Sequence, residues 1–257
     1  MVNLLNKTII DVFPNRRKHN LENYFSRIPL KERKKVEYVI SDLWDPYRKL
    51  TYKVFPNALL IADKYHYIRQ LYWGLQDIRK RIMYQQEEGS LEYYILKKYW
   101  KFFLTYTQNL SPNFFTPRKL GYHVTPEQIV NMAKEIHPDF KLAIELKDEF
   151  YELIHTTSLE EAHEKLNQFI YQLKTSGLKE YEYVARTYTN WKTEIVNSFH
   201  QEIDPKTGEI LNLTNGFIEG INNKIKVIKR VSFEYRNFNN FRTRIFACIN
   251  FDLSITN

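Results

Sequence analysis

The sequence predicts an α/β protein that is mostly helical. Three short apolar segments near the start, at residues 8–13, 35–42 and 58–63, alternate with helical patterns, and such alternation implies an α/β sheet. From about residue 65 onward the pattern is helical and rich in aromatic residues. The chain has only 7 Gly and 9 Pro among 257 residues, which argues against a loop-rich or all-β protein.

The first part of the chain predicts strands that end on acidic residues. The predicted elements are, in order, a strand at 8–13, a helix through 18–25, a strand at 35–42, a helix at 45–54 and a strand at 58–63. The last strand is apolar throughout, as expected of a strand that is covered on both faces. Asp42 closes the second strand and Asp63 the third.

The rest of the chain predicts helices with recognisable ends. Pro126 and Pro138 fit first helical positions, and Ser158 with Glu161 forms a capping-box pattern. Ser176-Gly177 ends that helix. The remaining predicted elements are one helix from 181 to about 200, a loop at 204–208, a helix over 215–230 and a last helix from about 237 to 249.

The helix predicted over 215–230 has two different faces. An apolar stripe follows its three- and four-residue steps: Ile218, Ile221, Ile225 and Ile228. The opposite face gathers one acid with amides and cations: Glu219, Asn222, Asn223, Lys226 and Arg230. Glu219 lies in the first turn, where an acid commonly complements the helix dipole. A carboxylate that holds a metal beside a polyanion would explain its neighbours as well.

Three further features have a structural and a functional interpretation. Asp42 either projects into the crevice at the carboxyl ends of the strands or caps the next helix, and the sequence favours neither. Asp63 and His66 could be metal ligands, but a cap with a structural hydrogen bond to His66 is favoured. The aromatic residues over 93–103 could stack on bases, but helix core is favoured.

The charge distribution predicts a polyanionic partner. The net charge is +8 and the pI about 9.2. Residues 215–246 contain seven Lys and Arg and two Glu, which gives a local net charge of +5. A membrane surface would attract such charge too, but no long apolar run or lipidation motif supports that, and the start is not a signal peptide. The single cysteine, Cys248, fits a reducing cytoplasm.

Six short segments match the pattern of one protein family in the right order: 11–17, 39–47, 55–58, 63–66, 214–226 and 235–238. The fifth contains Asn-Gly-x-x-Glu-Gly-x-Asn-Asn-x-Ile-Lys, which is highly specific, and Asp-x-x-His at 63–66 is moderately so. On these segments the chain resembles bacterial insertion-sequence transposases of the DDE class, in the ISL3 group. The resemblance covers nearly the whole chain.

The resemblance implies an RNase H-like core interrupted by an all-helical insertion. It divides the chain into partial core at 1–66, insertion at 67–213 and C-terminal core helices at 214–257. Asp42 corresponds to the second catalytic acid and Glu219 to the third, and the family's two divalent ions, Mg²⁺ or Mn²⁺, serve cleavage of transposon ends and strand transfer. Asp63, His66, Asn222 and Asn223 are expected beside the metals without ligating them.

The resemblance also implies DNA as the partner, a homo-oligomer in the transposition complex, and action in the bacterial cytoplasm on the nucleoid. The expected DNA-binding residues are Arg16, Arg17, Lys224, Lys226, Lys229, Arg230 and Arg236.

The chain departs from the family pattern at its start. In the family the first catalytic acid lies two strands before the segment at 8–13, and Asp11 matches an acidic position away from the metal site. We therefore expect a truncated core with weak or absent metal binding, in which the strands at 8–13 and 36–41 lack their usual partners. Two functions follow from this, a fragment of a DDE recombinase or a catalytically inactive nucleic-acid-binding remnant.

Overall fold

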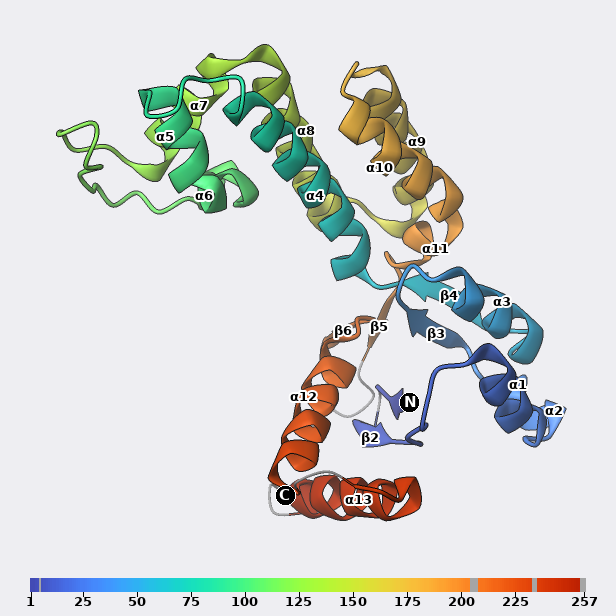
Figure 1. Cartoon of the computed structure of the whole chain (residues 1–257). Helices are drawn as coiled ribbons and strands as arrows, with labels where there is room; N and C mark the ends of the chain where they lie inside the picture. The colour runs from blue at the N-terminus through green and yellow to red at the C-terminus, as the bar shows by residue number, and fades with distance from the viewer. Residues whose placement is uncertain (5, 204–207, 233–234, 255–257) are drawn as a thin grey trace. The chain divides into compact units, whose positions relative to one another are not determined.

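The computed structural model describes residues 1–4, 6–203, 208–232 and 235–254, and confirms a mostly helical α/β chain. The chain forms two compact units (Figure 1). Unit 1 comprises residues 1–63 and 200–257, and unit 2 comprises residues 64–199. The predicted division into core and insertion, with residues 200–213 in the insertion, stays a prediction beside these two units. In the described part of the chain, no helix has the length and apolar character needed to cross a bilayer.

Unit 1 contains three two-stranded sheets in its described residues. The pairs are β1 (Val2–Asn3) with β2 (Thr8–Ile9), β3 (Tyr38–Ser41) with β4 (Leu59–Ala62), and β5 (Gln201–Ile203) with β6 (Ile210–Asn212). The β3–β4 pair is parallel and the other two are antiparallel. The strands predicted at 35–42 and 58–63 are confirmed as β3 and β4. The sequence did not predict β1, β5 or β6, and residues 204–207 of the predicted loop lie outside the described residues.

The helices of unit 1 supply two apolar clusters. They are α1 (Lys18–Ser26), α2 (Leu30–Arg33), α3 (Asp45–Val54), α12 (Gly216–Val231) and α13 (Phe238–Ser254). Leu21 and Phe25 of α1 pack with Leu50 and Val54 of α3. The second cluster consists of Ile9, Ile221, Ile245 and Ile249, with Ile225 and Ile228 packed against it. The apolar stripe predicted on α12 therefore faces β2 and α13.

The strand predicted at 8–13 is shorter in the structure, where Thr8–Ile9 pairs with β1. Beyond Ile9, the backbone N–H groups of Ile10 and Asp11 both donate to the carbonyl of Met1, and the Met1 amino group donates to the carbonyl of Asp11 at 2.7 Å. The Asp11 carboxylate is buried and accepts from Nε of Arg242 at 2.8 Å. Asp11 is therefore held by Met1 and by a side-chain contact with α13. The expectation that this segment lacks the usual partner of the family stays a prediction.

Unit 2 is helical throughout its regular structure. Its elements are α4 (Lys64–Met83), α5 (Leu91–Lys98), α6 (Trp100–Leu104), the 3-10 helix η1 (Thr107–Asn109), α7 (Pro126–Ile136), α8 (Pro138–Thr156), α9 (Leu159–Thr175), α10 (Lys179–Asn190) and α11 (Lys192–Asn197). The single helix predicted from 181 to 200 is broken at Trp191, which separates α10 from α11. The helix end predicted at Ser176-Gly177 is confirmed, because α9 stops at Thr175 and Gly177 has a φ of 75°.

Helix capping differs from the prediction at one position. A complete capping box forms at Thr125, whose hydroxyl accepts from the backbone of Gln128. Ser158 occupies the N-cap of α9 but makes no such bond. Its hydroxyl is hydrogen-bonded to the Glu160 carboxylate instead. The backbone N–H of Glu160 itself lowers the pKa of Glu160 most, and the bond from Ser158 lowers it further. The capping box predicted there is therefore wrong.

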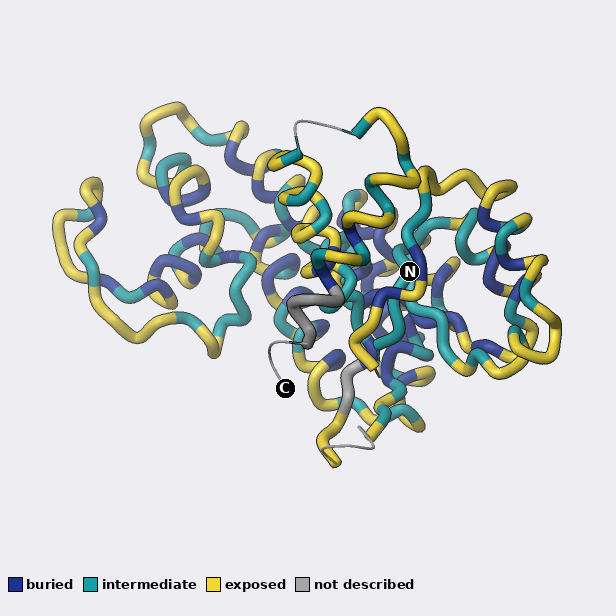
Figure 2. Tube along the Cα trace, turned by 90° about the horizontal axis from the view of Figure 1, so that it is seen from below, coloured by how far each residue is buried: buried dark blue, intermediate teal, exposed yellow. Residues whose placement is uncertain are grey.

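Buried tyrosines organise the core of unit 2. Tyr181 donates to the carbonyl of Ala143 at 2.9 Å, and Tyr188 donates to that of Tyr67 at 2.8 Å, so these hydroxyls are satisfied inside the core. Buried stretches recur along the helices of this unit between exposed turns (Figure 2). Within the aromatic segment 93–103, Tyr99 and Phe103 are buried, which supports the core interpretation of these two side chains.

Two helical glycines are expected to respond in opposite ways when they are replaced by alanine, because only one of them lies in a tight helix contact. A Cβ on Gly74 of α4 would lie 2.9 Å from Cδ1 of Tyr181, whose hydroxyl is fixed to Ala143. We expect Gly74→Ala to destabilise the protein by about 1–3 kcal/mol through overpacking. A Cβ on Gly220 of α12 would meet nothing within 4 Å, so Gly220→Ala should stabilise by up to ~1 kcal/mol. Urea unfolding of both variants measures this, and equal effects would contradict the tight contact.

The Asp11 contact predicts acid-sensitive stability. Burial alone would raise the pKa of Asp11, but hydrogen bonds from Arg242, Tyr24 and the Val12 N–H outweigh it and lower that pKa. A lowered pKa stabilises the fold above the unfolded value of 3.8, and this contribution is lost as pH falls through the folded value. We expect Asp11→Asn to cost about 1–3 kcal/mol at pH 7 and little at pH 2. Urea unfolding at both pH values checks this; a pH-independent cost would contradict the ionic origin.

Candidate metal centre and nucleic-acid interface

The paired ends of β3 and β4 place two carboxylates side by side. Ser41 is the register partner of Ala62, so Asp42 and Asp63 are the next residues at the same edge. The backbone N–H of Asp63 donates to the carbonyl of Ser41 at 3.0 Å, which extends the ladder by one bond. Asp63 is buried and Asp42 is half-buried. Carboxyl ends of parallel strands are where α/β proteins commonly place ligand-binding groups.

Asn215 connects α12 to both carboxylates. It stands immediately before Gly216, and its side-chain Nδ2 donates to Oδ1 of Asp42 at 3.4 Å. Its backbone N–H donates to Oδ1 of Asp63, also at 3.4 Å. The helix that carries Glu219 therefore begins at the acid pair. No contact of Asn215 with the strand acids was predicted from the sequence, although its place at the head of the Glu-containing motif was a usable signal.

The β5–β6 pair, which precedes α12, also contacts β3. The Tyr38 hydroxyl is hydrogen-bonded to Glu202 of β5, and this bond, together with burial, raises the pKa of Tyr38 to about 12. The ring of Tyr38 lies 5.9 Å from that of His200. Because β5 and β6 lead directly into α12, these contacts help to bring Asn215 to the end of β3.

His66 lies three residues after Asp63, in the first turn of α4. Asp42 and Asp63 of unit 1 each offer one ligand-type atom, and these atoms lie within 4.8 Å of each other. Two carboxylates suit a hard divalent cation. Within unit 2, the Arg69 guanidinium donates to Nδ1 of His66 at 3.1 Å, since an arginine can only donate. The supporting role expected for His66 stays a prediction.

Glu219 stands apart from this group in the described structure. It is exposed in the first turn of α12, and its backbone N–H donates to the carbonyl of Asn215 at 3.0 Å. The group of ligand-type atoms found among the described residues does not include it. Asn222 and Asn223 are exposed on the same helix, and Asn223 accepts from Lys226 at 3.5 Å. A shared metal site of Asp42 and Glu219 therefore stays a prediction.

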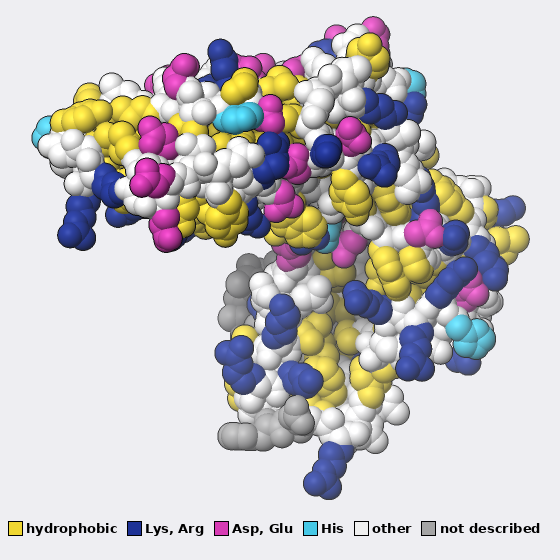
Figure 3. Space-filling model, turned by 45° about the horizontal axis from the view of Figure 1, so that its top comes forward, with side chains coloured by type: hydrophobic (Ala, Val, Ile, Leu, Met, Phe, Trp, Pro, Cys, Tyr) yellow, Lys and Arg dark blue, Asp and Glu magenta, His cyan; other side chains and the backbone are white. Residues whose placement is uncertain are grey.

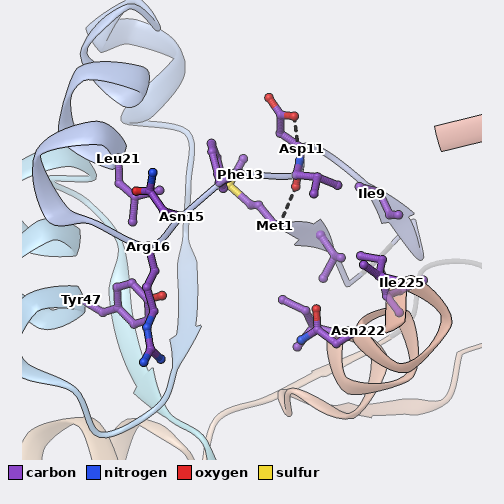
Figure 4. A pocket seen from close by; sticks show the side chains of 14 residues that line it. Met1, Ile9, Asp11, Phe13, Asn15, Arg16, Leu21, Tyr47, Asn222 and Ile225 are labelled. Atoms are coloured by element: carbon purple, nitrogen blue, oxygen red, sulfur yellow. Dashed lines mark hydrogen bonds between the residues drawn. The ribbon is translucent and has the colours of Figure 1, made fainter. Parts of the chain in front are cut away.

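A pocket of about 410 Å³ lies in unit 1 beside α12 (Figure 4). Arg16 and Tyr47 line one side of it, and Asn222 and Ile225 line the other. The Arg16 guanidinium also lies 5.5 Å from the centre of the Trp44 ring. Burial raises the pKa of Tyr47, and the positive charge of Arg16 partly opposes this. The pocket lining thus combines apolar side chains with the Arg16 cation, the Asp11 carboxylate and the amides of Asn15 and Asn222.

The basic residues expected to bind DNA are all exposed. They are Arg16 and Arg17 before α1, Lys224, Lys226, Lys229 and Arg230 on α12, and Arg236 before α13. In the space-filling view, Lys and Arg side chains stand over the α12 and α13 part of unit 1 with few acidic side chains among them (Figure 3). Their exposure suits contacts with phosphates, which lie at the surface of a duplex.

A comparison with protein families identifies a family that the chain matches. The model of a family described as a transposase, of the DDE class and the ISL3 group, matches residues 1–245. No curated protein sequence and no solved structure matches the chain.

The hydrogen bond from Arg69 predicts a supporting role for His66. We expect His66→Ala to lower the free energy of unfolding by about 1–3 kcal/mol, because a charged donor loses its acceptor. The affinity for Mn²⁺ should change little, since Asp42 and Glu219, the expected ligands, remain. Thermal unfolding and a Mn²⁺ titration followed by electron paramagnetic resonance measure the two quantities. Weaker Mn²⁺ binding with an unchanged melting temperature would identify His66 as a ligand instead.

Proposed function

Since the chain belongs to the ISL3 group of DDE transposases, we propose that it acts in DNA transposition through metal-dependent strand cleavage and strand transfer at insertion-sequence ends. The observation that carries this proposal is the link from the acid pair to the glutamate helix. Asn215 contacts both Asp42 and Asp63 and begins the helix in whose first turn Glu219 lies. One rigid element thus leads from the strand carboxylates to the third acid of the motif.

We assign metal binding to Asp42 and Glu219, with Asp63 and His66 as supporting residues. Bound Mg²⁺ or Mn²⁺ would supply polarisation of the scissile phosphate and activation of the attacking hydroxyl. In this proposal Asp63 and Asn215 fix the position of the Asp42 carboxylate, and Asn222 and Asn223 line the helix face beside Glu219. The carboxylates of Asp42 and Glu219 are ligands of the kind that a hard cation takes, and the approach of one Asp63 oxygen to within 4.8 Å of Asp42 supports the positioning role of Asp63.

We further propose that unit 1 contains an RNase H-like core and that unit 2 is an insertion into it. The RNase H-like core is supported by the order β3, α3, β4 along the chain, in which the two strands pair in parallel. The second part is supported by the path of the chain, which leaves unit 1 after Asp63 and returns at His200. Assembly into a homo-oligomer and action on the bacterial nucleoid remain predictions from the family.

The DNA would lie along the basic side of α12. Lys226, Lys229 and Arg230 are exposed there, and Arg236 follows in the next segment. Neutralising phosphates with such side chains gives affinity that falls as the salt concentration rises. Among the described residues, a Cβ built on Gly220 would meet no atom outside its own helix turn within 4 Å, which supports space beside Glu219 for the DNA backbone.

A second candidate is DNA binding without cleavage. One observation favours it: Glu219 is outside the group of ligand-type atoms that contains Asp42 and Asp63 among the described residues. In this alternative the basic residues hold DNA while the carboxylates serve only the fold.

A cleavage assay on the full chain separates the two candidates. The substrate is a supercoiled plasmid that carries the element's own ends, incubated with Mg²⁺ or Mn²⁺, and DNA binding is measured in parallel by gel shift. For the enzyme we expect Asp42→Asn and Glu219→Gln to abolish nicking while binding stays nearly intact, since only metal-dependent chemistry is removed. Glu209→Gln, outside the motif, serves as the charge-matched control.

The outcomes are distinct. If the wild type nicks the plasmid and the Glu219→Gln variant nicks it at a comparable rate, Glu219 is only an acid of the first helical turn and not a metal ligand. Binding without nicking by the wild type would support the second candidate. A chain that binds no DNA would contradict both.

A further inference from the structure

One side of α4 carries an exposed ladder of two aromatic rings with an arginine between them. Tyr65, Arg69 and Trp73 follow at four-residue spacing, so they lie on the same side of the helix. The guanidinium carbon of Arg69 lies 5.2 Å from the centre of the Tyr65 ring and 4.5 Å from that of Trp73. Tyr65 is 57% and Trp73 51% exposed. These rings are therefore available to a partner, unlike the buried aromatics of the core.

The charge of Arg69 is not neutralised by an acidic side chain in the described part of the chain. Its guanidinium donates to Nδ1 of His66, and its buried Nε has no hydrogen-bond partner among the described residues. The nearest acid along this side of α4 is Asp77, which pairs with Lys80 at 3.2 Å. The ladder thus presents a positive charge flanked by two exposed rings.

A second column of rings in unit 2 provides a comparison. Tyr106 and Tyr151 stack at 4.2 Å, and Tyr151 and His155 at 4.0 Å. Carboxylates accompany this column, since the Tyr106 hydroxyl donates to Glu152 at 2.7 Å. Negative charge would repel a phosphate there, so of these two sets of rings the α4 ladder is the one that offers both stacking and attraction to a nucleic acid.

We propose that Tyr65, Arg69 and Trp73 bind unpaired nucleotides of DNA, with a base on the Trp73 ring and a phosphate at the Arg69 guanidinium. Exposed aromatics stack on any base, and a cation beside them attracts the backbone. A duplex keeps its bases stacked on each other, so it cannot use the rings in this way. The proposal rests on DNA being the substrate and adds the strand form that this surface recognises. The ladder begins two residues after Asp63, so it follows the acid pair directly along the chain.

Fluorescence anisotropy on the full chain tests this, in EDTA so that no cleavage occurs. The probes are a labelled oligothymidylate of about 12 nucleotides, within the ~4–16 typical of single-strand sites, and a labelled mixed-sequence duplex. We expect Trp73→Ala and Arg69→Ala to weaken oligothymidylate binding by about 5- to 150-fold, which corresponds to losing ~1–3 kcal/mol of stacking. Duplex binding should stay unchanged. Trp73→Phe keeps a ring and should retain most of the affinity.

Tyr183→Ala is the matched control, because Tyr183 is 64% exposed in unit 2 and lies on α10. It should leave both affinities unchanged, and circular dichroism melting establishes that each variant folds. The proposal is overturned if the wild type binds the duplex but not the oligothymidylate. It is also overturned if Trp73→Ala leaves both affinities unchanged, or if it weakens both affinities by the same factor. Those results leave the proposed function standing. Wild type that binds neither probe overturns the proposed function and this inference with it.

Discussion

The parallel pairing of β3 with β4 is the contact on which the candidate site depends. Because side chains alternate between the faces of a strand, a slip of one residue would turn Asp42 or Asp63 to the opposite face. The observed register pairs Ser41 with Ala62, and the Asp63 N–H adds one more bond, to the Ser41 carbonyl. The acid pair is therefore a consequence of this backbone pairing.

Two adjacent carboxylates repel each other, and the fold offsets this repulsion with hydrogen-bond donors. Asn215 contributes both its side-chain and its backbone N–H. Charge-assisted hydrogen bonds of this kind are stronger than neutral ones, although both are long here. The same residue starts α12, so the position of the helix and the electrostatic balance of the acid pair are coupled. A change at residue 215 would alter both together.

The elements predicted from the sequence are those with a strong local signal. The apolar run at 58–63 indicated β4, and the spacing of Ile221, Ile225 and Ile228 indicated the buried side of α12. The short strands β1, β5 and β6 lack such a run, so they were missed. The contact of Asp11 with Arg242 joins residues 231 positions apart, and no local pattern reveals it. The break at Trp191 likewise depends on tertiary packing.

For the candidate site, the sequence singled out acidic residues but did not predict how they are grouped. Asp42 and Asp63 were each identified as candidates, and the structure brings one ligand-type atom of each to within 4.8 Å of the other. The contacts of Asn215 with Asp42 and of Arg69 with His66 depend on partners that only the folded chain supplies. Glu219 was singled out by its motif, and its exposed position could not be inferred from helical spacing, which describes a face without saying what covers it.

The path of the chain has a consequence for folding. Unit 1 is assembled from both ends of the sequence, so its two parts must meet across all of residues 64–199. Closing a flexible loop of that length costs about 4 kcal/mol in entropy, against about 1.5 kcal/mol for a turn of five residues. Unit 2 holds its own ends together, with Tyr67 hydrogen-bonded to Ser198 at 2.9 Å and the Lys64 ammonium 5.6 Å from the centre of the Phe199 ring. Once the helices of unit 2 have folded, the loop that unit 1 must close is effectively a short one. The folding of unit 2 therefore lowers the entropic cost of assembling unit 1.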